Sequence, residues 1–110
     1  VNIDLKGFTP EWYQRLGGDL ETVKRSISLA AERCHVEVTT LLVPGENDSE
    51  EEVRTLAQWL ASVDQDIPLH LSRFFPRYRM IDRPPTSVER VYRLADVART
   101  YLSFVYTGNC

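Results

Sequence analysis

Four short β-strand patterns recur along the chain at nearly equal intervals. They begin near positions 1, 36, 69 and 104, so successive starts lie 35, 33 and 35 residues apart. Each interval contains one main helix pattern, with apolar residues at helical spacing. Strand–helix–strand units of this length need parallel strands and a right-handed crossover. The repeat therefore predicts an α/β fold with about four strand–helix units.

The polar residues of these strands bear on the choice between two parallel architectures. In an open, doubly wound sheet, helices cover both faces and the strands should be apolar on both. Here three successive strands keep polar side chains on one face, which suits a barrel lumen better. We therefore expect a single domain, residues 1–110, forming part of a parallel (β/α) barrel. These residues should face its lumen: Asp4, Lys6, Glu37, Thr39, His70 and Ser72.

Local signals predict where helices begin and where strands lie. Ser49 with Glu52, and Thr86 with Glu89, have the spacing of capping boxes at helix starts. Cys34 ends a helical pattern, and we expect it to be a small buried side chain. Alternating apolar residues place three strands after the first one, at residues 35–43, 69–75 and 103–106.

Composition excludes several classes of protein and suggests a compartment. Thirteen basic and sixteen acidic side chains give a net charge of -3, which argues against a general nucleic-acid binder. No apolar run is long enough to span a bilayer, and we expect no signal peptide. Cys34 and Cys110 make no disulfide framework, so we expect a reducing, cytoplasmic setting. The only Met is Met80 and Val1 opens inside a strand pattern, so we expect a fragment of a longer protein.

Asp4 and Lys6 are the first candidates for chemistry. They lie two positions apart near the end of the first strand, so both project from one face. Ligands of parallel barrels bind at this end of the strands. Such a pair suits a zwitterion, with Lys6 on its carboxylate and Asp4 on its amine or on a ribose hydroxyl. Two alternatives are a structural ion pair and a Schiff-base nucleophile at Lys6, as in aldolase-type barrels.

The neighbouring strands supply further candidates. Glu37 and Thr39 are expected as second contacts to a ligand, although Glu37 could simply neutralise Lys6. A lone His in a strand, such as His70, is more often a hydrogen-bonded core residue than a catalyst. No second His lies at the spacing of a metal site, so we predict no metal ligands in this chain.

The segment after the third strand is rich in arginine. It could bind a carboxylate, a phosphate or an acidic partner protein, and the whole chain could then be a non-enzymatic interaction module. The alternative is that these arginines are solvated and packed on aromatic rings. The segment contains Arg73, Arg77, Arg79 and Arg83, with Phe74, Phe75 and Tyr78 between them.

Three segments in this order resemble a known family: Asp4-Leu5-Lys6, residues 43–48 (VPGEND) and residues 70–76 (HLSRFFP). The chain resembles the radical SAM proteins of the pyruvate formate-lyase activating enzyme class, most closely the subgroup of the AmmeMemoRadiSam system. The likeness runs to Tyr-Thr-Gly-Asn at residues 106–109. It implies that the chain is the C-terminal half of a partial (β/α)6 barrel.

The resemblance also implies a chemistry for the parent protein. Such oxidoreductases bind a 4Fe–4S iron–sulfur cluster through a Cys-x3-Cys-x2-Cys loop and use it to reduce S-adenosylmethionine (SAM). The resulting 5′-deoxyadenosyl radical abstracts hydrogen, in activases from a glycine of a partner protein. The Asp-x-Lys pair contacts the methionine moiety of SAM, so Asp4 and Lys6 inherit that role. We expect Glu37, Thr39, His70 and Ser72 to be further cofactor contacts, and Arg73, Arg77 and Arg79 to approach a substrate or partner.

Two departures from the family pattern limit what this chain should do. The Cys-x3-Cys-x2-Cys motif is absent, so we expect the chain alone neither to hold the cluster nor to catalyse. Activases place Tyr-His where Phe74-Phe75 stand here, which removes one expected SAM contact. A half-barrel also leaves two strand edges without partners, so we expect the fragment to self-associate through them.

Overall fold

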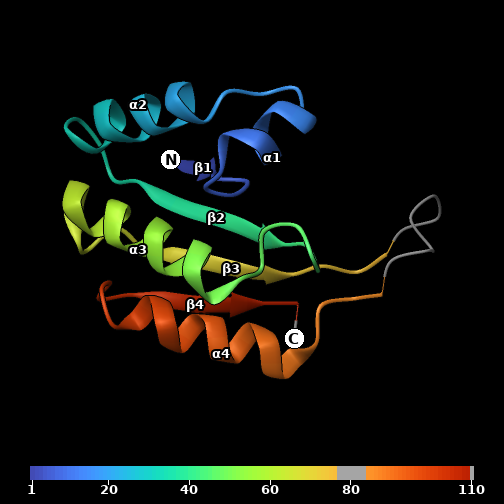
Figure 1. The fold of residues 1–110 in the computed structure, drawn as a ribbon. Coiled ribbons are helices and arrows are strands. Elements are labelled where there is room, and N and C mark those ends of the chain that lie inside the picture. The colour runs from blue at the N-terminus through green and yellow to red at the C-terminus, as the bar shows by residue number, and fades with distance from the viewer. Residues whose placement is uncertain (77–83, 110) are drawn as a thin grey trace.

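Four parallel strands form one sheet, in the spatial order β1-β2-β3-β4 (Figure 1). This architecture comes from a computed structural model that describes residues 1–76 and 84–109. Each strand lies beside its successor in the chain, as expected for repeated strand–helix units. The strands are β1 (Asn2–Asp4), β2 (Glu37–Leu42), β3 (Leu69–Arg73) and β4 (Val105–Gly108).

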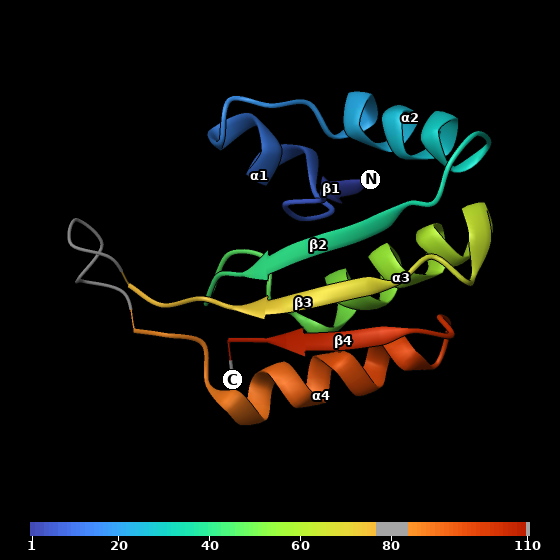
Figure 2. The ribbon, with the colours of Figure 1, turned by 180° about the vertical axis from the view of Figure 1, so that it is seen from behind.

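The helices pack on one side of the sheet and leave the other side open. Seen from behind, the strands lie in front and no helix crosses them (Figure 2). Along β2 the burial alternates accordingly: Val38, Thr40 and Leu42 are buried, whereas Leu41 is 44% exposed. A doubly wound sheet would carry helices on both faces, so that alternative is wrong and the α/β half-barrel arrangement is confirmed. The helices are α1 (Pro10–Arg15), α2 (Leu20–Ala31), α3 (Glu50–Asp64) and α4 (Val88–Arg99).

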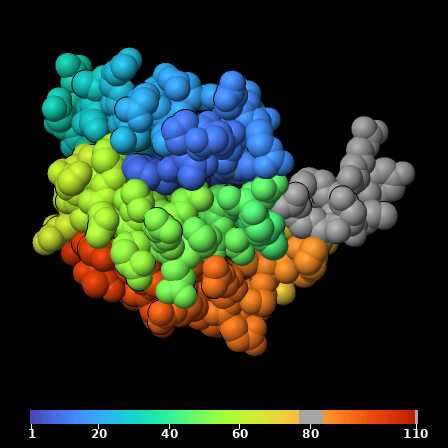
Figure 3. Space-filling model, in the orientation of Figure 1, coloured from blue at the N-terminus to red at the C-terminus, as the bar shows by residue number. Residues whose placement is uncertain are grey.

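The hydrophobic core lies between the sheet and these helices. In Figure 3 the helix side faces the viewer, with α3 in the middle between the segments of α2 and α4. Apolar residues at helical spacing meet the buried face of each strand, as the sequence pattern predicts. None of the described helices is long and apolar enough to cross a bilayer. The fully buried side chains include Leu5, Ile27, Val38, Leu42, Leu56, Leu60, Leu69, Leu71 and Leu94.

The third and fourth strands differ from the predicted ranges. β3 ends at Arg73, and the next two residues do not continue its alternation: Phe74 is buried and Phe75 is 46% exposed. The reason is that Phe74 and Thr86 exchange hydrogen bonds, which takes the chain out of the sheet ladder. β4 begins two residues later than predicted, because its register pairs Val105 with the first residue of β3.

Two predictions about single residues are wrong. Cys34 is exposed, because α2 ends at Ala31 and Cys34 lies in the turn beyond the helix. Thr86 does not cap α4; Ser87 does, accepting a hydrogen bond from the backbone N–H of Arg90. The Thr86 side chain is buried instead, and its hydroxyl donates to the carbonyl oxygen of Leu42. Thr86 therefore ties the end of β2 to the segment that leads into α4.

Candidate functional site

The strand register aligns the predicted site residues in rows on the open face of the sheet. One row pairs Asp4 with Thr39, Thr39 with His70, and His70 with Tyr106, so it crosses all four strands. We call this surface the open face; it carries Asp4, Glu37, Thr39, Leu41, His70, Ser72 and Tyr106. Ser72 lies one pleat closer to the carboxyl ends of the strands, beside Leu41 and Gly108.

Glu37 lies at the centre of a polar network on the open face. One of its carboxylate oxygens lies 2.6 Å from Nε2 of His70, and the other lies 3.2 Å from Nε2 of His35. The hydrogen bond with His70, followed by that with His35, holds the pKa of Glu37 below its ordinary value. The ring of Tyr106 stacks on His70, with centroids 5.2 Å apart. Glu37 therefore pairs with histidines and not with Lys6.

Asp4 and Lys6 remain exposed at the end of β1. Within the described part of the chain, neither side chain has a salt-bridge partner, so the structure does not contain the proposed ion pair between them. Thr39, next to Asp4 in the row, donates a hydrogen bond to the side-chain oxygen of Asn2 at 3.0 Å. A Schiff-base lysine needs a desolvated amine. The exposure of Lys6 therefore gives the aldolase-type alternative less support.

The backbone of Lys6, by contrast, is held on both sides. Its N–H donates to the hydroxyl of Tyr13 at 2.7 Å. Its carbonyl oxygen accepts from Nε1 of Trp12 at 2.8 Å and from Nδ2 of Asn47 at 2.9 Å. None of these three residues was predicted as part of the site. Their side chains act on the backbone of Lys6, and that role has no one-residue signature in the sequence.

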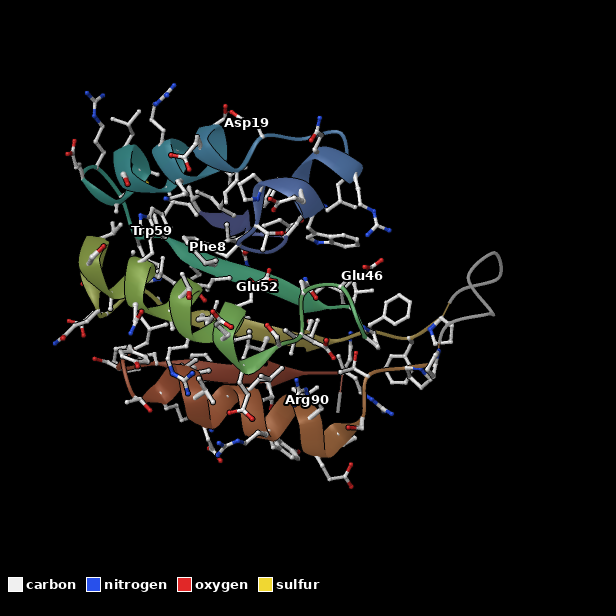
Figure 4. The ribbon with its side chains drawn as sticks, in the orientation of Figure 1. Phe8, Asp19, Glu46, Glu52, Trp59 and Arg90 are labelled. Carbon is white, nitrogen blue, oxygen red and sulfur yellow. The ribbon has the colours of Figure 1, made fainter. Side chains whose placement is uncertain are left out.

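The turn after Lys6 is equally constrained. Gly7 has φ +153°, and a Cβ there would lie 2.6 Å from Cδ1 of Trp12 and 3.0 Å from Oε2 of Glu52. The same Oε2 accepts the N–H of Phe8 at 2.7 Å, and Figure 4 labels Glu52 on α3 close to Phe8. Burial raises the pKa of Glu52. Ser49 caps α3 and accepts the N–H of Glu52, as its spacing predicts. The Glu52 carboxylate does not complete the capping box; it joins the first turn of α3 to the loop that leaves β1.

A shallow hollow of about 110 Å³ lies beside Lys6. Its apolar walls come from α1, from β2 and from the segments that follow them: Trp12, Leu16, Leu41 and Val43. Leu16 and Leu41 are almost half exposed. The segment just beyond β1 thus offers an ammonium that has no salt-bridge partner among the described residues, beside an apolar wall. Asp4 lies two residues earlier, at the last position of β1.

Only part of the arginine-rich segment can be placed. Nε of Arg73 donates to the carbonyl oxygen of Thr86, and its guanidinium carbon lies 4.5 Å from the ring centroid of Phe75. This contact agrees with the alternative of arginines packed on aromatic rings. Arg77, Arg79 and Arg83 lie outside the described residues. No group of three potential metal-ligating side chains is found among residues 1–76 and 84–109.

Comparisons with known proteins support the fold. A domain of a pyruvate-formate lyase-activating enzyme from Bacteroides vulgatus superimposes with a TM-score of 0.82 at 21% identity, covering 98% of this chain and 66% of that one. A radical SAM methyltransferase from Sphaerobacter thermophilus gives a TM-score of 0.70 at 22% identity, covering 96% of this chain and 32% of the other.

One curated relative shares more sequence. An uncharacterized protein of Methanocaldococcus jannaschii is 34% identical over 112 residues; the match covers 99% of this chain but only 34% of the relative. No family model matches the chain. The expected likeness to the activating enzyme is thus confirmed at the level of the fold: the chain has the half-barrel fold of that enzyme's domain, which also occurs in a radical SAM methyltransferase.

Proposed function

We propose that this chain is the C-terminal part of a radical SAM core barrel and provides part of its SAM-binding groove. One observation carries the proposal. Lys6 has its peptide groups fixed by three side chains, while its ammonium has no salt-bridge partner among the described residues. It lies at the carboxyl end of a parallel strand, where such folds bind their ligands. The fold shared with a radical SAM methyltransferase supports SAM as that ligand.

The side chains present fit the chemistry of SAM. The Lys6 ammonium would bind the carboxylate of the methionine moiety, and the Asp4 carboxylate would bind its amine or a ribose hydroxyl. The row that contains Thr39 and His70 continues from Asp4 across the open face, so it would flank the same ligand. Glu37 would keep the His70 ring oriented through their 2.6 Å hydrogen bond. Ser72, one pleat further along β3, completes the proposed set.

The side chains do not fit an iron–sulfur cluster. Such clusters are held by several cysteine thiolates. The chain has two cysteines, and Cys34 lies in the turn after α2, at the end of the sheet opposite Lys6. In this proposal the cluster belongs to another part of the protein, and this chain contributes no catalytic residue. The parent would be an activase-like oxidoreductase whose substrate is a partner protein.

Two measurements on the full-length protein, purified anaerobically and reconstituted with iron and sulfide, test the proposal. SAM affinity is measured by calorimetry, and reductive SAM cleavage is followed as 5′-deoxyadenosine formation. Lys6→Ala and Asp4→Ala should each weaken SAM binding by about tenfold or more, since a charge-assisted hydrogen bond contributes about 1.5–3 kcal/mol.

A matched control is Lys24→Ala. Lys24 is a lysine on α2 whose ammonium lies over the rings of Phe8 and Trp59 on the helix side of the sheet. Its replacement should leave SAM affinity unchanged. Unchanged affinity in Lys6→Ala would remove the proposed role of Lys6, and an intact cluster that forms no 5′-deoxyadenosine would remove the enzymatic assignment.

A further inference from the structure

Lys6 lies beyond the part of β1 that the sheet ladder holds. β1 ends at Asp4, and the last backbone hydrogen bond to β2 runs from the N–H of Leu5 to the carbonyl oxygen of Thr39. From Lys6 onward, backbone pairing no longer fixes the direction of the chain. Any fixed orientation of the Lys6 side chain must therefore come from side chains that bind its backbone.

Asn47 provides the first of these constraints. Its side chain is 2% exposed and uses both of its donors and its acceptor. Oδ1 accepts the N–H of Val43 at 2.7 Å. Nδ2 donates to the carbonyl oxygens of Leu41 at 2.8 Å and of Lys6 at 2.9 Å. One buried amide thus joins the carboxyl ends of two neighbouring strands. It continues the link between β1 and β2 where the ladder has ended.

Trp12 supplies the second constraint on the same atom. Its indole N–H, on α1, donates to the carbonyl oxygen of Lys6 at 2.8 Å. A carbonyl oxygen has two lone pairs, and both are used here. The N–H of Lys6 is held by Tyr13. Both peptide groups that flank Lys6 are therefore fixed, although its own side chain is exposed.

We infer that Asn47 and Trp12 are positioning residues that orient Lys6 toward the carboxylate of its ligand; this inference rests on the proposed function. Buried hydrogen bonds from two separate segments converge on a residue whose ammonium has no described partner. Orientation of that ammonium toward a bound anion accounts for both facts. If Asn47 were purely structural, it would only close the turn after β2, and its effect on ligand affinity would not depend on Lys6.

A double-mutant cycle separates these two roles. SAM affinity is measured in the full-length protein for Asn47→Ala and Trp12→Phe, each with Lys6 intact and with Lys6→Ala. Positioning predicts that each single change weakens binding by about tenfold, within the coupling range of residues in one network. It also predicts that neither change weakens binding further once Lys6 is removed. Additive losses would overturn the inference.

Two controls address folding. Trp12→Phe keeps an aromatic ring while it removes the indole N–H, so the test stands even if Asn47→Ala does not fold. Ser87→Ala removes the cap of α4 and lowers stability at a helix that packs against α3, β3 and β4. Its SAM affinity should equal that of the wild type. A loss equal to that of Trp12→Phe would mean that general destabilisation is the cause, which would also overturn the inference.

Amide hydrogen exchange distinguishes failure of this inference from failure of the proposed function. In Trp12→Phe and Asn47→Ala the loop that carries Lys6 loses a donor to its carbonyl oxygen, so the Lys6 amide, whose N–H is held by Tyr13, should lose protection as the loop loosens. The Leu69 amide in β3, which donates to the carbonyl oxygen of Phe104, should keep its protection. A wild-type protein that binds no SAM but shows this exchange pattern would remove the proposed function and leave the fixed backbone of Lys6 intact. Unchanged protection of Lys6 in both variants would remove the positioning role.

Discussion

His70 and Glu37 are joined across the open face of the sheet, with Nε2 of His70 2.6 Å from Oε1 of Glu37. The two residues are diagonal neighbours, because the register pairs His70 with Thr39 and not with Glu37. His35 approaches the other oxygen of the same carboxylate. One carboxylate therefore bridges two imidazoles that the chain contributes from two different strand regions.

The first prediction concerns Glu37 and pH. The hydrogen bond with His70 lowers the pKa of Glu37 from its ordinary value of 4.5. A lowered carboxyl pKa contributes stability that is present above that ordinary value and lost as the pH falls through the lower folded value. Glu37→Gln should therefore unfold more easily than the wild type at neutral pH, with a difference that shrinks in acid. Urea unfolding from neutral pH into acid measures this difference in the free energy of unfolding. In a His70→Ala background, Glu37→Gln should change the free energy of unfolding by a smaller amount.

The second prediction concerns Glu52, whose pKa shifts in the opposite direction. Burial raises its pKa, so its contribution is full below the ordinary value and is lost as the pH rises through the higher folded value. Glu52→Gln keeps an oxygen for the N–H of Phe8 without burying a charge. We expect its melting temperature to exceed that of the wild type at neutral pH and to match it in acid. Glu52→Ala leaves that N–H without its acceptor and should melt lower at both pH values; a Gln variant that behaves like Ala would contradict the prediction.

The third prediction concerns Gly7. Alanine there would need an unusual backbone angle and would also place its Cβ 2.6 Å from Cδ1 of Trp12. We expect Gly7→Ala to lower the free energy of unfolding by roughly 2–4 kcal/mol, the sum of backbone strain and a steric clash. Gly45 is the matched control: its φ is +78°, but a Cβ there would meet no atom within 4 Å. Gly45→Ala should therefore cost less, and equal losses in the two variants would show that the contact with Trp12 is unimportant.

The fourth prediction separates Thr86 from Ser87. Ser87→Ala should cost about 1 kcal/mol and reduce the helical circular dichroism signal, because it removes the cap of α4. Thr86→Val keeps the side-chain volume but leaves the buried carbonyl oxygen of Leu42 without its donor. Thr86→Val should lower the free energy of unfolding by about 1–3 kcal/mol and leave the helical signal of the native state unchanged. A loss of helical signal in Thr86→Val but not in Ser87→Ala would favour the capping role that the sequence spacing suggests for Thr86.

The sequence by itself determined the repeat and the division of each strand into two faces. Strands alternate with a period of two and helices repeat every 3.6 residues, so local spacing alone places Val38 in the core and Glu37 on the open face. The same alternation placed Asp4, Thr39 and His70 on one surface, and the register then aligned them in a single row. These features follow from neighbours in the chain, which is why the sequence pattern was sufficient.

Only the tertiary structure decided which side chains meet. Asn47 reaches Lys6 across 41 positions, and Thr86 reaches Leu42 across 44. Ser49 caps α3 as predicted, but the Glu52 side chain binds the N–H of Phe8 and Thr86 binds the carbonyl oxygen of Leu42. A buried polar atom forms whichever hydrogen bond the packed elements bring within reach. Local spacing predicted that Thr86 caps α4 and that Cys34 is buried. In the packed structure Ser87 caps α4 and Cys34 is exposed. The face of each residue is a property of its own strand or helix, whereas its partner depends on how distant segments pack together.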